Sequence, residues 1–232
     1  MERKKYLVVT AGGSGSRMGS ALPKQFLSLG GRAVLQMTIE RFREAVPDIK
    51  VFTVLPEAHL AWWRAYCRER NFNCPQRLVQ GGFTRFHSVK NALAYVPDGA
   101  IVAVHDGVRP LLSVQLIRDL FARMETGRAV IPVVPCVDTL AVLDRGEDGT
   151  LRDSGENVDR SRIFGAQTPQ LFRSEDLKAA YAQGYDLSFT DDASVARRYG
   201  IPLSYMAGER NNIKLTTKED LALAEAILQI SG

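Results

Sequence analysis

Two long cationic side chains flank a glycine-rich segment near the amino terminus. The segment reads TAGGSGSRMGSALPKQF over residues 10–26, and it carries Arg17 and Lys24. Successive glycines let backbone N–H groups approach anionic oxygens closely. A flexible cation on either side of such a loop can surround a triphosphate and stabilise charge that develops in a transition state. The pattern therefore favours a phosphate site over a plain glycine turn.

Two common phosphate-binding motifs are absent from this segment. The pattern GxxxxGK followed by Ser or Thr fails because Gln25 follows Lys24. The dinucleotide fingerprint GxGxxG fails because Gly13, Gly15 and Gly19 are spaced as GxGxxxG, and no acidic residue closes a second strand about 20 residues later. These departures disfavour a kinase and a dehydrogenase.

A single aspartate follows the apolar run AIVAV at residues 100–104. Asp106 should point into the crevice at the carboxyl ends of the strands, where ligands bind in open α/β sheets. One carboxylate with phosphate oxygens and waters is a typical arrangement for Mg²⁺, and another divalent cation can take its place. The alternative is a turn aspartate before Gly107. We interpret His105 as structural, because a lone histidine is a poor Mg²⁺ ligand.

Apolar runs typical of buried strands alternate with helical patterns along most of the chain. The order predicts an α/β fold with a mostly parallel sheet covered on both faces. Near the carboxyl end, Thr217 and Asp220 are spaced like a helix capping box. Strands are expected at 7–10, 51–55, 100–104 and 129–134, and helices around 35–46, 60–67, 89–96, 117–124, 174–184, after 190 and after 217.

The alternation changes between residues 137 and 160. Short apolar residues alternate there around Asp148 and Gly149, a pair typical of a hairpin turn. Such a hairpin has little helix to cover it. We interpret it as an arm that leaves the main domain, as a dimer element or a lid, and an ordinary surface hairpin is the alternative.

Composition limits the class of protein. The 232 residues include 45% hydrophobic and 24% charged residues, as in an ordinary globular protein, and no apolar run approaches the roughly 18 residues needed to span a bilayer. The net charge of +4 suits a small anionic substrate, and the scattered basic residues argue against nucleic acid. Cys67, Cys74 and Cys136 form no metal or disulfide pattern. With no signal-peptide pattern after MERKK, we expect a cytoplasmic protein.

Seven segments together give the chain a family resemblance. The glycine segment GGSGSRMG with PKQFL resembles the sugar-phosphate nucleotidyltransferases, and within them the cytidylyltransferases. The resemblance spans nearly the whole chain in the right order, and it implies a three-layer Rossmann-like nucleotidyltransferase fold in a single domain, residues 1–232. The later segments are GGFTRFHSV (81–89), VHDGVRP (104–110), CVDTL (136–140), VDRSRIFGAQTPQLF (158–172), TDDAS (190–194) and NNIKLTTKEDLALAE (211–225).

The resemblance implies transfer of CMP from CTP to a sugar-alcohol phosphate, with release of pyrophosphate. The nucleophile would be a phosphate oxygen, which is already anionic, so no general base is required. Positive charge and positioning must then supply the catalysis. By resemblance, Arg17 and Lys24 stabilise the transition state, Lys214 reaches the reacting phosphates, and Arg160 positions the attacking phosphate.

The resemblance also assigns the two halves of the site. It implies that the protruding arm crosses to a partner subunit, so that a homodimer shares the substrate site. The nucleotide-binding residues would be Ala11, Gly12, Gly13, Gly15, Gly81, Gly82, Ser88 and Asp106, with Asp106 also the metal ligand. The residues that bind the sugar phosphate would be Arg109, Thr139, Arg160, Thr168, Thr190 and Lys214.

Several positions depart from the family pattern, and two alternative functions stay open. The chain has Ala11-Gly12 where relatives often have Ala-Ala, HDGVR where they have HDAAR, and Asn211 where an acidic residue is common. The segments TDDAS and VDRSR favour methylerythritol phosphate as the acceptor over ribitol 5-phosphate. The remaining alternative is a non-catalytic nucleotide-binding module, because a fold does not fix function.

Overall fold

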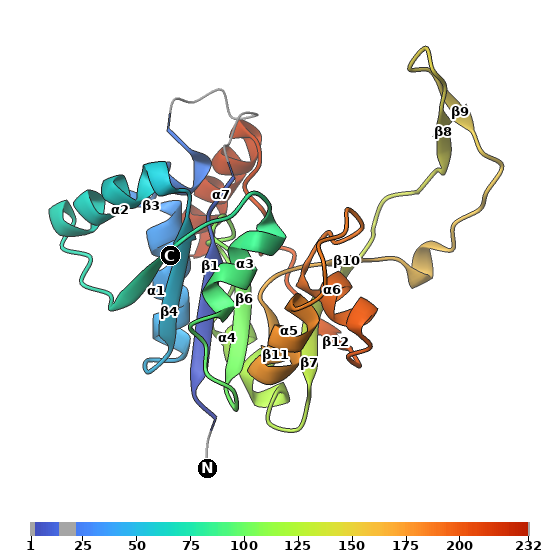
Figure 1. Ribbon diagram of the computed structural model, residues 1–232. Helices are drawn as coiled ribbons and strands as arrows, with labels where there is room; N and C mark the ends of the chain where they lie inside the picture. Colours follow the sequence, from blue (N-terminus) through green and yellow to red (C-terminus); the bar gives the residue numbers. More distant parts are fainter. Residues whose placement is uncertain (1–2, 14–21, 232) are drawn as a thin grey trace.

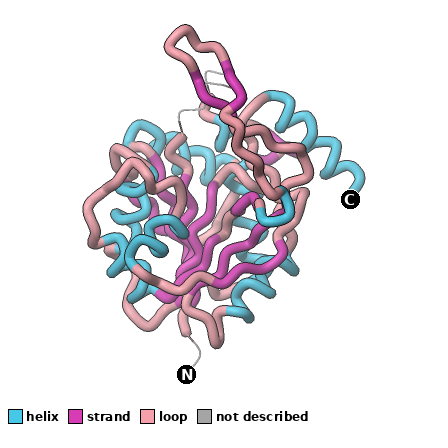
Figure 2. Tube along the Cα trace, turned by 90° about the vertical axis from the view of Figure 1, so that its right-hand side faces the viewer, coloured by secondary structure: helices cyan, strands magenta, loops and turns pink. Residues whose placement is uncertain are grey.

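The structure is a computed structural model, and it describes residues 3–13 and 22–231. This part of the chain forms an eight-stranded sheet in the order β10-β7-β11-β6-β1-β4-β5, with β12 paired to β7. Figure 2 shows the strands running through the centre with helices on both sides. The strands of the sheet are β1 (Lys5–Thr10), β4 (Lys50–Leu55), β5 (Gln76–Gln80), β6 (Ile101–Asp106), β7 (Ala129–Pro135), β10 (Phe164–Ala166), β11 (Gln170–Arg173) and β12 (Ser204–Ala207).

Parallel pairing dominates this sheet. Strand β1 is parallel to β4 and β6, β4 is parallel to β5, and β12 is parallel to β7. Strands β10 and β11 run antiparallel to their neighbours. The carboxyl ends of β1, β4, β5 and β6 therefore meet at one edge, where an open α/β sheet binds ligands.

Helices cover both faces of the sheet, as a parallel sheet requires. Helices α1 (Val34–Ala45), α2 (Glu57–Glu69) and α4 (Val114–Arg123) share one apolar cluster with the sheet. Helices α3 (Arg85–Leu93), α5 (Ser174–Tyr181) and α6 (Asp192–Tyr199) share another. Helix α7 (Lys218–Ser231) packs against β2 (Ser28–Leu29), which pairs with β3 (Arg32–Ala33). The predicted three-layer α/β fold is confirmed.

The arm is a separate two-stranded hairpin. Strands β8 (Leu143–Arg145) and β9 (Leu151–Asp153) pair antiparallel, and every residue of both strands is exposed. Figure 1 shows the hairpin extending well away from the body of the molecule. The turn lies at the predicted Asp148-Gly149 pair, where Gly149 has a φ of 80°, which favours glycine. The predicted hairpin is therefore confirmed.

The predicted strands correspond to β1, β4, β6 and β7, whereas β5, β10, β11 and β12 were not predicted, although β11 is buried in the middle of the sheet. The predicted capping pair at the start of α7 forms, with Thr217 N donating to Asp220 Oδ2 at 2.8 Å. Val96 lies beyond α3, which ends at Leu93. Strand β5 escaped prediction because Val79 is its only buried residue, so its sequence QRLVQ carries too few apolar residues. No helix of the described residues is long and apolar enough to cross a membrane.

Candidate active site

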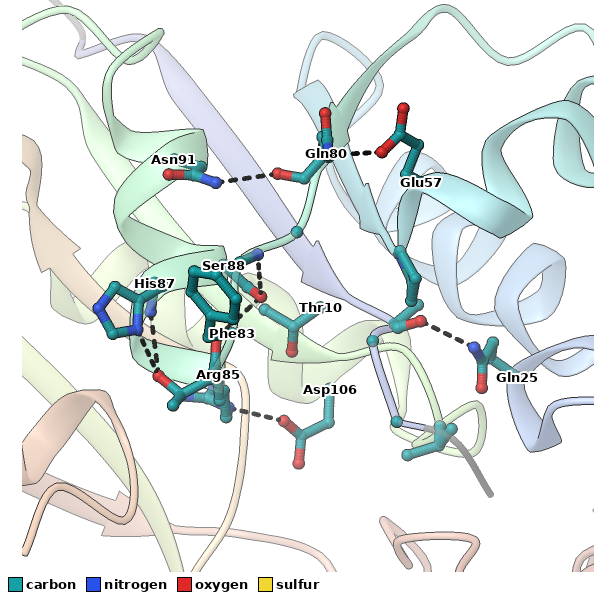
Figure 3. Close-up of a pocket in the computed structure, with 18 of the residues that line it drawn as sticks. Thr10, Gln25, Glu57, Gln80, Phe83, Arg85, His87, Ser88, Asn91 and Asp106 are labelled. Carbon is teal, nitrogen blue, oxygen red and sulfur yellow. Dashed lines mark hydrogen bonds and ion pairs between the residues drawn. The ribbon is translucent and has the colours of Figure 1, made fainter. Parts of the chain in front are cut away.

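A cavity of about 810 Å³ opens at the carboxyl edge of the parallel strands. Its walls come directly after four neighbouring strands: Ala11 after β1, Pro56 after β4, Gly81 after β5, and Asp106 at the end of β6. Lys24 and Lys214 complete the lining from outside the sheet. Figure 3 shows the side chains that converge on this pocket. The fold thus brings residues more than 200 positions apart to one site.

Lys24 is held beside Gly13 by the two residues that follow it. A Cβ added to Gly13 would lie 3.6 Å from Lys24 Cε, so the lysine chain passes close to this glycine. The buried Gln25 donates from Nε2 to the carbonyl oxygen of Ala11 at 2.8 Å. Phe26 packs on α2, with its ring centroid 4.2 Å from that of Trp62. Lys24 therefore lies on a short 3₁₀ turn that the contacts of Gln25 and Phe26 hold in place.

Asp106 lies at the centre of a cluster of three cations from separate parts of the chain. Its carboxylate oxygens are 2.9 Å from Lys214 Nζ, 3.4 Å from Arg85 Nε and 3.7 Å from Arg109 Nε. Burial acting alone would raise the pKa of Asp106. The charges of the three cations outweigh burial and hold this pKa well below its ordinary value. Asp106 is therefore ionised at neutral pH.

Arg85 connects this cluster to α6. It donates from NH2 to Asp192 Oδ2 at 2.7 Å, and Tyr181 donates its hydroxyl to the other oxygen of Asp192 at 2.6 Å. Burial alone would lower the pKa of Arg85, but Asp192 and Asp106 raise it well above its ordinary value. Sequence reasoning missed Arg85. One signal was available, because a cation at the first position of a helix opposes the helix dipole and needs a specific partner.

His105 faces away from this chemistry. It is fully buried, and its Nε2 lies 3.1 Å from the carbonyl oxygen of Arg109, which accepts a hydrogen bond from the Nε2–H of the neutral ring. Its ring packs edge-on against Phe42 in the core. Burial lowers the pKa of His105 to about 4, so the ring is neutral at physiological pH. The histidine is structural, as the sequence indicated.

The loop after β5 is held by its own backbone and by Ser88. Gly81 N donates to the carbonyl oxygen of Leu55 at 2.8 Å, and Gly82 N donates to Ser88 Oγ at 3.1 Å. A Cβ added to Gly82 would lie 2.5 Å from the Cβ of His87, so this position requires glycine. Ser88 donates to Thr84 O at 2.9 Å, and Thr84 rather than Ser88 caps α3. One acceptor lone pair of Ser88 remains for a ligand.

Three predicted substrate residues lie around Asp106. Thr168 Oγ1 accepts from Asp106 N at 3.1 Å. Arg109 donates from NH1 to the carbonyl oxygen of Asn212 at 2.6 Å, and neither Thr168 nor Arg109 lines the cavity. Lys214 is fixed by its neighbour Leu215, whose N donates to Val108 O at 2.9 Å. Asn211, which departs from the family pattern, is exposed and does not line the cavity.

The remaining predicted substrate residues lie elsewhere on the chain. Thr139, Arg160 and Thr190 are exposed and do not line the cavity. Arg160 donates from NH1 to the carbonyl oxygen of Val137 at 3.0 Å, so it joins the two roots of the arm. Gly15 and Arg17 lie outside the described residues. The structure thus groups Lys24, Lys214 and Asp106 but leaves the arm residues apart from them.

The donors at the cavity fit a magnesium ion only in part. Among the described residues, no three His, Cys, Asp or Glu side chains form a metal cluster. Two carboxylates line the cavity. Glu57 accepts a hydrogen bond from Gln80 Nε2 at 3.1 Å, and Asp106 is ionised because its pKa is held low. Mg²⁺ in nucleotide sites commonly takes one or two carboxylates and completes its shell with phosphates and waters. Asp106 fits that role with a bound triphosphate.

Comparison with known proteins agrees with the whole-chain resemblance. The family model described as 2-C-methyl-D-erythritol 4-phosphate cytidylyltransferase matches residues 6–230. Relatives with that name include one from Porphyromonas gingivalis, 47% identical over 98% of this chain and 99% of its own, and one from Bacteroides thetaiotaomicron, 44% identical over 97% of this chain and all of its own.

Solved structures agree in fold. A 4-diphosphocytidyl-2C-methyl-D-erythritol synthase from Anaerococcus prevotii matches with a TM-score of 0.78 and 26% identity, over 98% of this chain and 99% of that one. A 2-C-methyl-D-erythritol 4-phosphate cytidylyltransferase from Thermus thermophilus matches with a TM-score of 0.75 and 29% identity, over 99% and 100% of the two chains. This chain belongs to the 2-C-methyl-D-erythritol 4-phosphate cytidylyltransferase family.

Proposed function

We propose that this protein transfers CMP from CTP to 2-C-methyl-D-erythritol 4-phosphate. A phosphate oxygen of the acceptor attacks the α-phosphorus of CTP in line, and the bond from that phosphorus to the β-phosphate oxygen breaks. The products are 4-diphosphocytidyl-2-C-methyl-D-erythritol and pyrophosphate, in the non-mevalonate route to isoprenoids. The observation that carries the proposal is the meeting of Lys24, Lys214 and Asp106 in one cavity at the strand ends of a chain of this family.

The residues of the cavity suit a reaction without a general base. The attacking oxygen is already ionised, and His105 is buried, neutral and turned away from the cavity. The barrier lies in bringing two polyanions together and in stabilising the charge of the transition state. Lys24 lies beside Gly13, where the triphosphate would bind, and Lys214 lies across the cavity beside Asp106. Arg17 is proposed as a further cation on the triphosphate.

Asp106 is proposed to hold a divalent cation together with the triphosphate. When bound, the ion would neutralise phosphate charge and orient the α-phosphate. Asp106 itself keeps Lys214, Arg85 and Arg109 gathered near the reacting phosphates. The carboxylate also limits the repulsion among these cations before the nucleotide arrives.

The acceptor half of the site is proposed to form in a homodimer. The arm extends away from the body, and Thr139 and Arg160 at its roots do not line the cavity of their own chain. The exposed apolar side chains Val137, Leu143 and Leu151 give the arm a surface that a partner subunit would cover. We propose that the chain is one nucleotidyltransferase domain whose arm crosses to the second subunit, so that Arg160 and Thr139 join Arg109, Thr168 and Thr190 around the acceptor.

We propose that the protein acts in the cytoplasm. The three cysteines of the chain are free thiols, as is usual for a protein in a reducing compartment.

The test is pyrophosphate release from CTP and Mg²⁺, with methylerythritol phosphate and ribitol 5-phosphate offered in parallel. We expect faster release with methylerythritol phosphate. The Lys24→Ala variant should lower turnover by about 10²–10³-fold while changing the affinity for CTP much less, because Lys24 acts mainly on transition-state charge. A preference for ribitol 5-phosphate would overturn the acceptor, and unchanged turnover in Lys24→Ala would overturn the role of this lysine.

A further inference from the structure

Phe83 presents an exposed aromatic ring at the wall of the cavity. Its exposed fraction is 102%, so the side chain is as open to solvent as in an extended peptide. It lines the cavity, and among the lining residues that the structure describes the only other aromatic ring is that of His87. Because this exposed phenylalanine lies at a cavity wall, its large apolar face is available to a ligand, and covering it would be favourable.

The backbone on both sides of Phe83 is fixed. Gly82 N is bound by Ser88 Oγ, and Thr84 accepts from His87 N as the cap of α3. The loop passes so close to His87 at position 82 that only glycine fits there. The ring of Phe83 meets that of His87 edge-on, with the centroids 6.5 Å apart. A ring presented from a fixed loop loses little conformational entropy when a ligand stacks on it.

The cavity has two chemically different sides. Figure 3 shows Phe83, His87 and Ser88 together on one side and Gln25 on the other. Lys24 and Lys214 supply positive charge for phosphates, and the side with Phe83 supplies an aromatic face and the free acceptor lone pair of Ser88. A nucleotide has the same division, with an anionic end and a flat base.

We propose that the ring of Phe83 stacks on the pyrimidine base of the bound nucleoside triphosphate and is a determinant of nucleotide affinity. This inference rests on the proposed function, because it takes the nucleotide of that reaction as the ligand. Stacking of a base on an aromatic ring depends on the flat π-face that every base has, so it discriminates little between bases. Phe83 therefore contributes affinity, while polar groups of the loop after β5 are left to recognise the edge of the base.

The experiment compares Phe83→Ala and Phe83→Trp by titration calorimetry with two probes in the presence of Mg²⁺. One probe is CTP, and the other is inorganic triphosphate, which has the phosphates without a base. We expect Phe83→Ala to weaken CTP binding about tenfold and to leave triphosphate binding within about twofold of wild type, as stacking energies indicate. Phe83→Trp should bind CTP at least as tightly as wild type.

Leu187→Ala provides the matched control. Leu187 is 88% exposed and does not line the cavity, so its loss should leave the binding of both probes unchanged. Wild-type CTP affinity in Phe83→Ala, or an equal loss for CTP and triphosphate, would overturn the stacking inference and leave the proposed function standing. A change in subunit association in Phe83→Ala would assign the ring to a protein interface instead. Failure of the wild-type protein to bind CTP would overturn the proposed function and this inference with it.

Discussion

The Asp106 cluster and the arm carry similar residue types in opposite surroundings. Asp106 is buried among Lys214, Arg85 and Arg109, which come from three separate parts of the fold. Arg160 is exposed at the root of the arm, and the carbonyl oxygen of Val137 is its hydrogen-bond partner. Burial strengthens electrostatic interactions and fixes their geometry, whereas exposed charges are screened by water. Under the proposed function, the buried cluster would serve the nucleotide, and the exposed arm would need a second subunit to serve the acceptor.

The largest effect is expected from removing the charge at the centre of the buried cluster. The Asp106→Asn variant keeps the shape of the side chain but leaves three cations facing each other, two of them largely buried. Breaking a buried pair in this way typically costs about 3–5 kcal/mol of unfolding free energy. Urea denaturation would measure this loss, and pyrophosphate release should fall by about 10²–10³-fold.

Asp144→Asn on the arm is the matched control for that variant. Asp144 lies in β8, whose residues are all exposed. Its neutralisation should change neither the denaturation midpoint nor the rate. An Asp106→Asn protein that unfolds at the wild-type urea concentration would show that the buried cluster does not stabilise the fold.

A second difference between the buried site and the arm is how each makes the stability of the fold depend on pH. Burial lowers the pKa of His105 to about 4, against about 6.5 in an unfolded chain. Between these values the unfolded state binds one proton more than the folded state, so stability falls as the pH falls. The contribution of His105 is complete above about pH 6.5 and declines by about 1.4 kcal/mol per pH unit, to a total loss of roughly 3 kcal/mol near pH 4. Denaturation at pH 7, 6 and 5 would measure the slope.

The His105→Gln variant should remove the contribution of one proton, about 1.4 kcal/mol per pH unit, from the dependence of stability on pH. Glutamine can still donate to the carbonyl oxygen of Arg109 but does not titrate. Arm variants such as Arg160→Ala should keep the wild-type slope. An unchanged slope in His105→Gln would assign the pH dependence to other groups.

The smallest effect on stability is expected from the arm. Arg160→Ala removes an exposed side chain and one hydrogen bond to Val137, so the denaturation midpoint should not change measurably. Under the proposed function, the same variant should raise the KM for methylerythritol phosphate and leave CTP affinity unchanged. Weaker CTP binding would contradict the division of the site into two halves.

The sequence was most informative where a motif and its position in the fold coincide. The glycine segment, Lys24 and the aspartate after a buried strand could be placed at the strand ends because parallel strands bring their carboxyl ends to one edge. Sequence reasoning missed β5 because an edge strand with one buried residue has no clear apolar pattern. It also missed Gln25 and Phe83, whose importance depends on what they contact or fail to contact.

The order of residues along the chain determined the fold class and the hairpin, because periodicity and turn residues act on neighbours in sequence. The seven motifs that carry the family resemblance are likewise visible in the sequence alone. The charge balance of the site was set by folding. Arg85 meets Asp192 across 107 positions and Asp106 across 21, and neither separation signals an ion pair. Such contacts arise where strand ends and helix starts are packed together, and burial and the neighbouring charges together then set the pKa values. A sequence names the charged residues, whereas packing decides which of them share a dry environment.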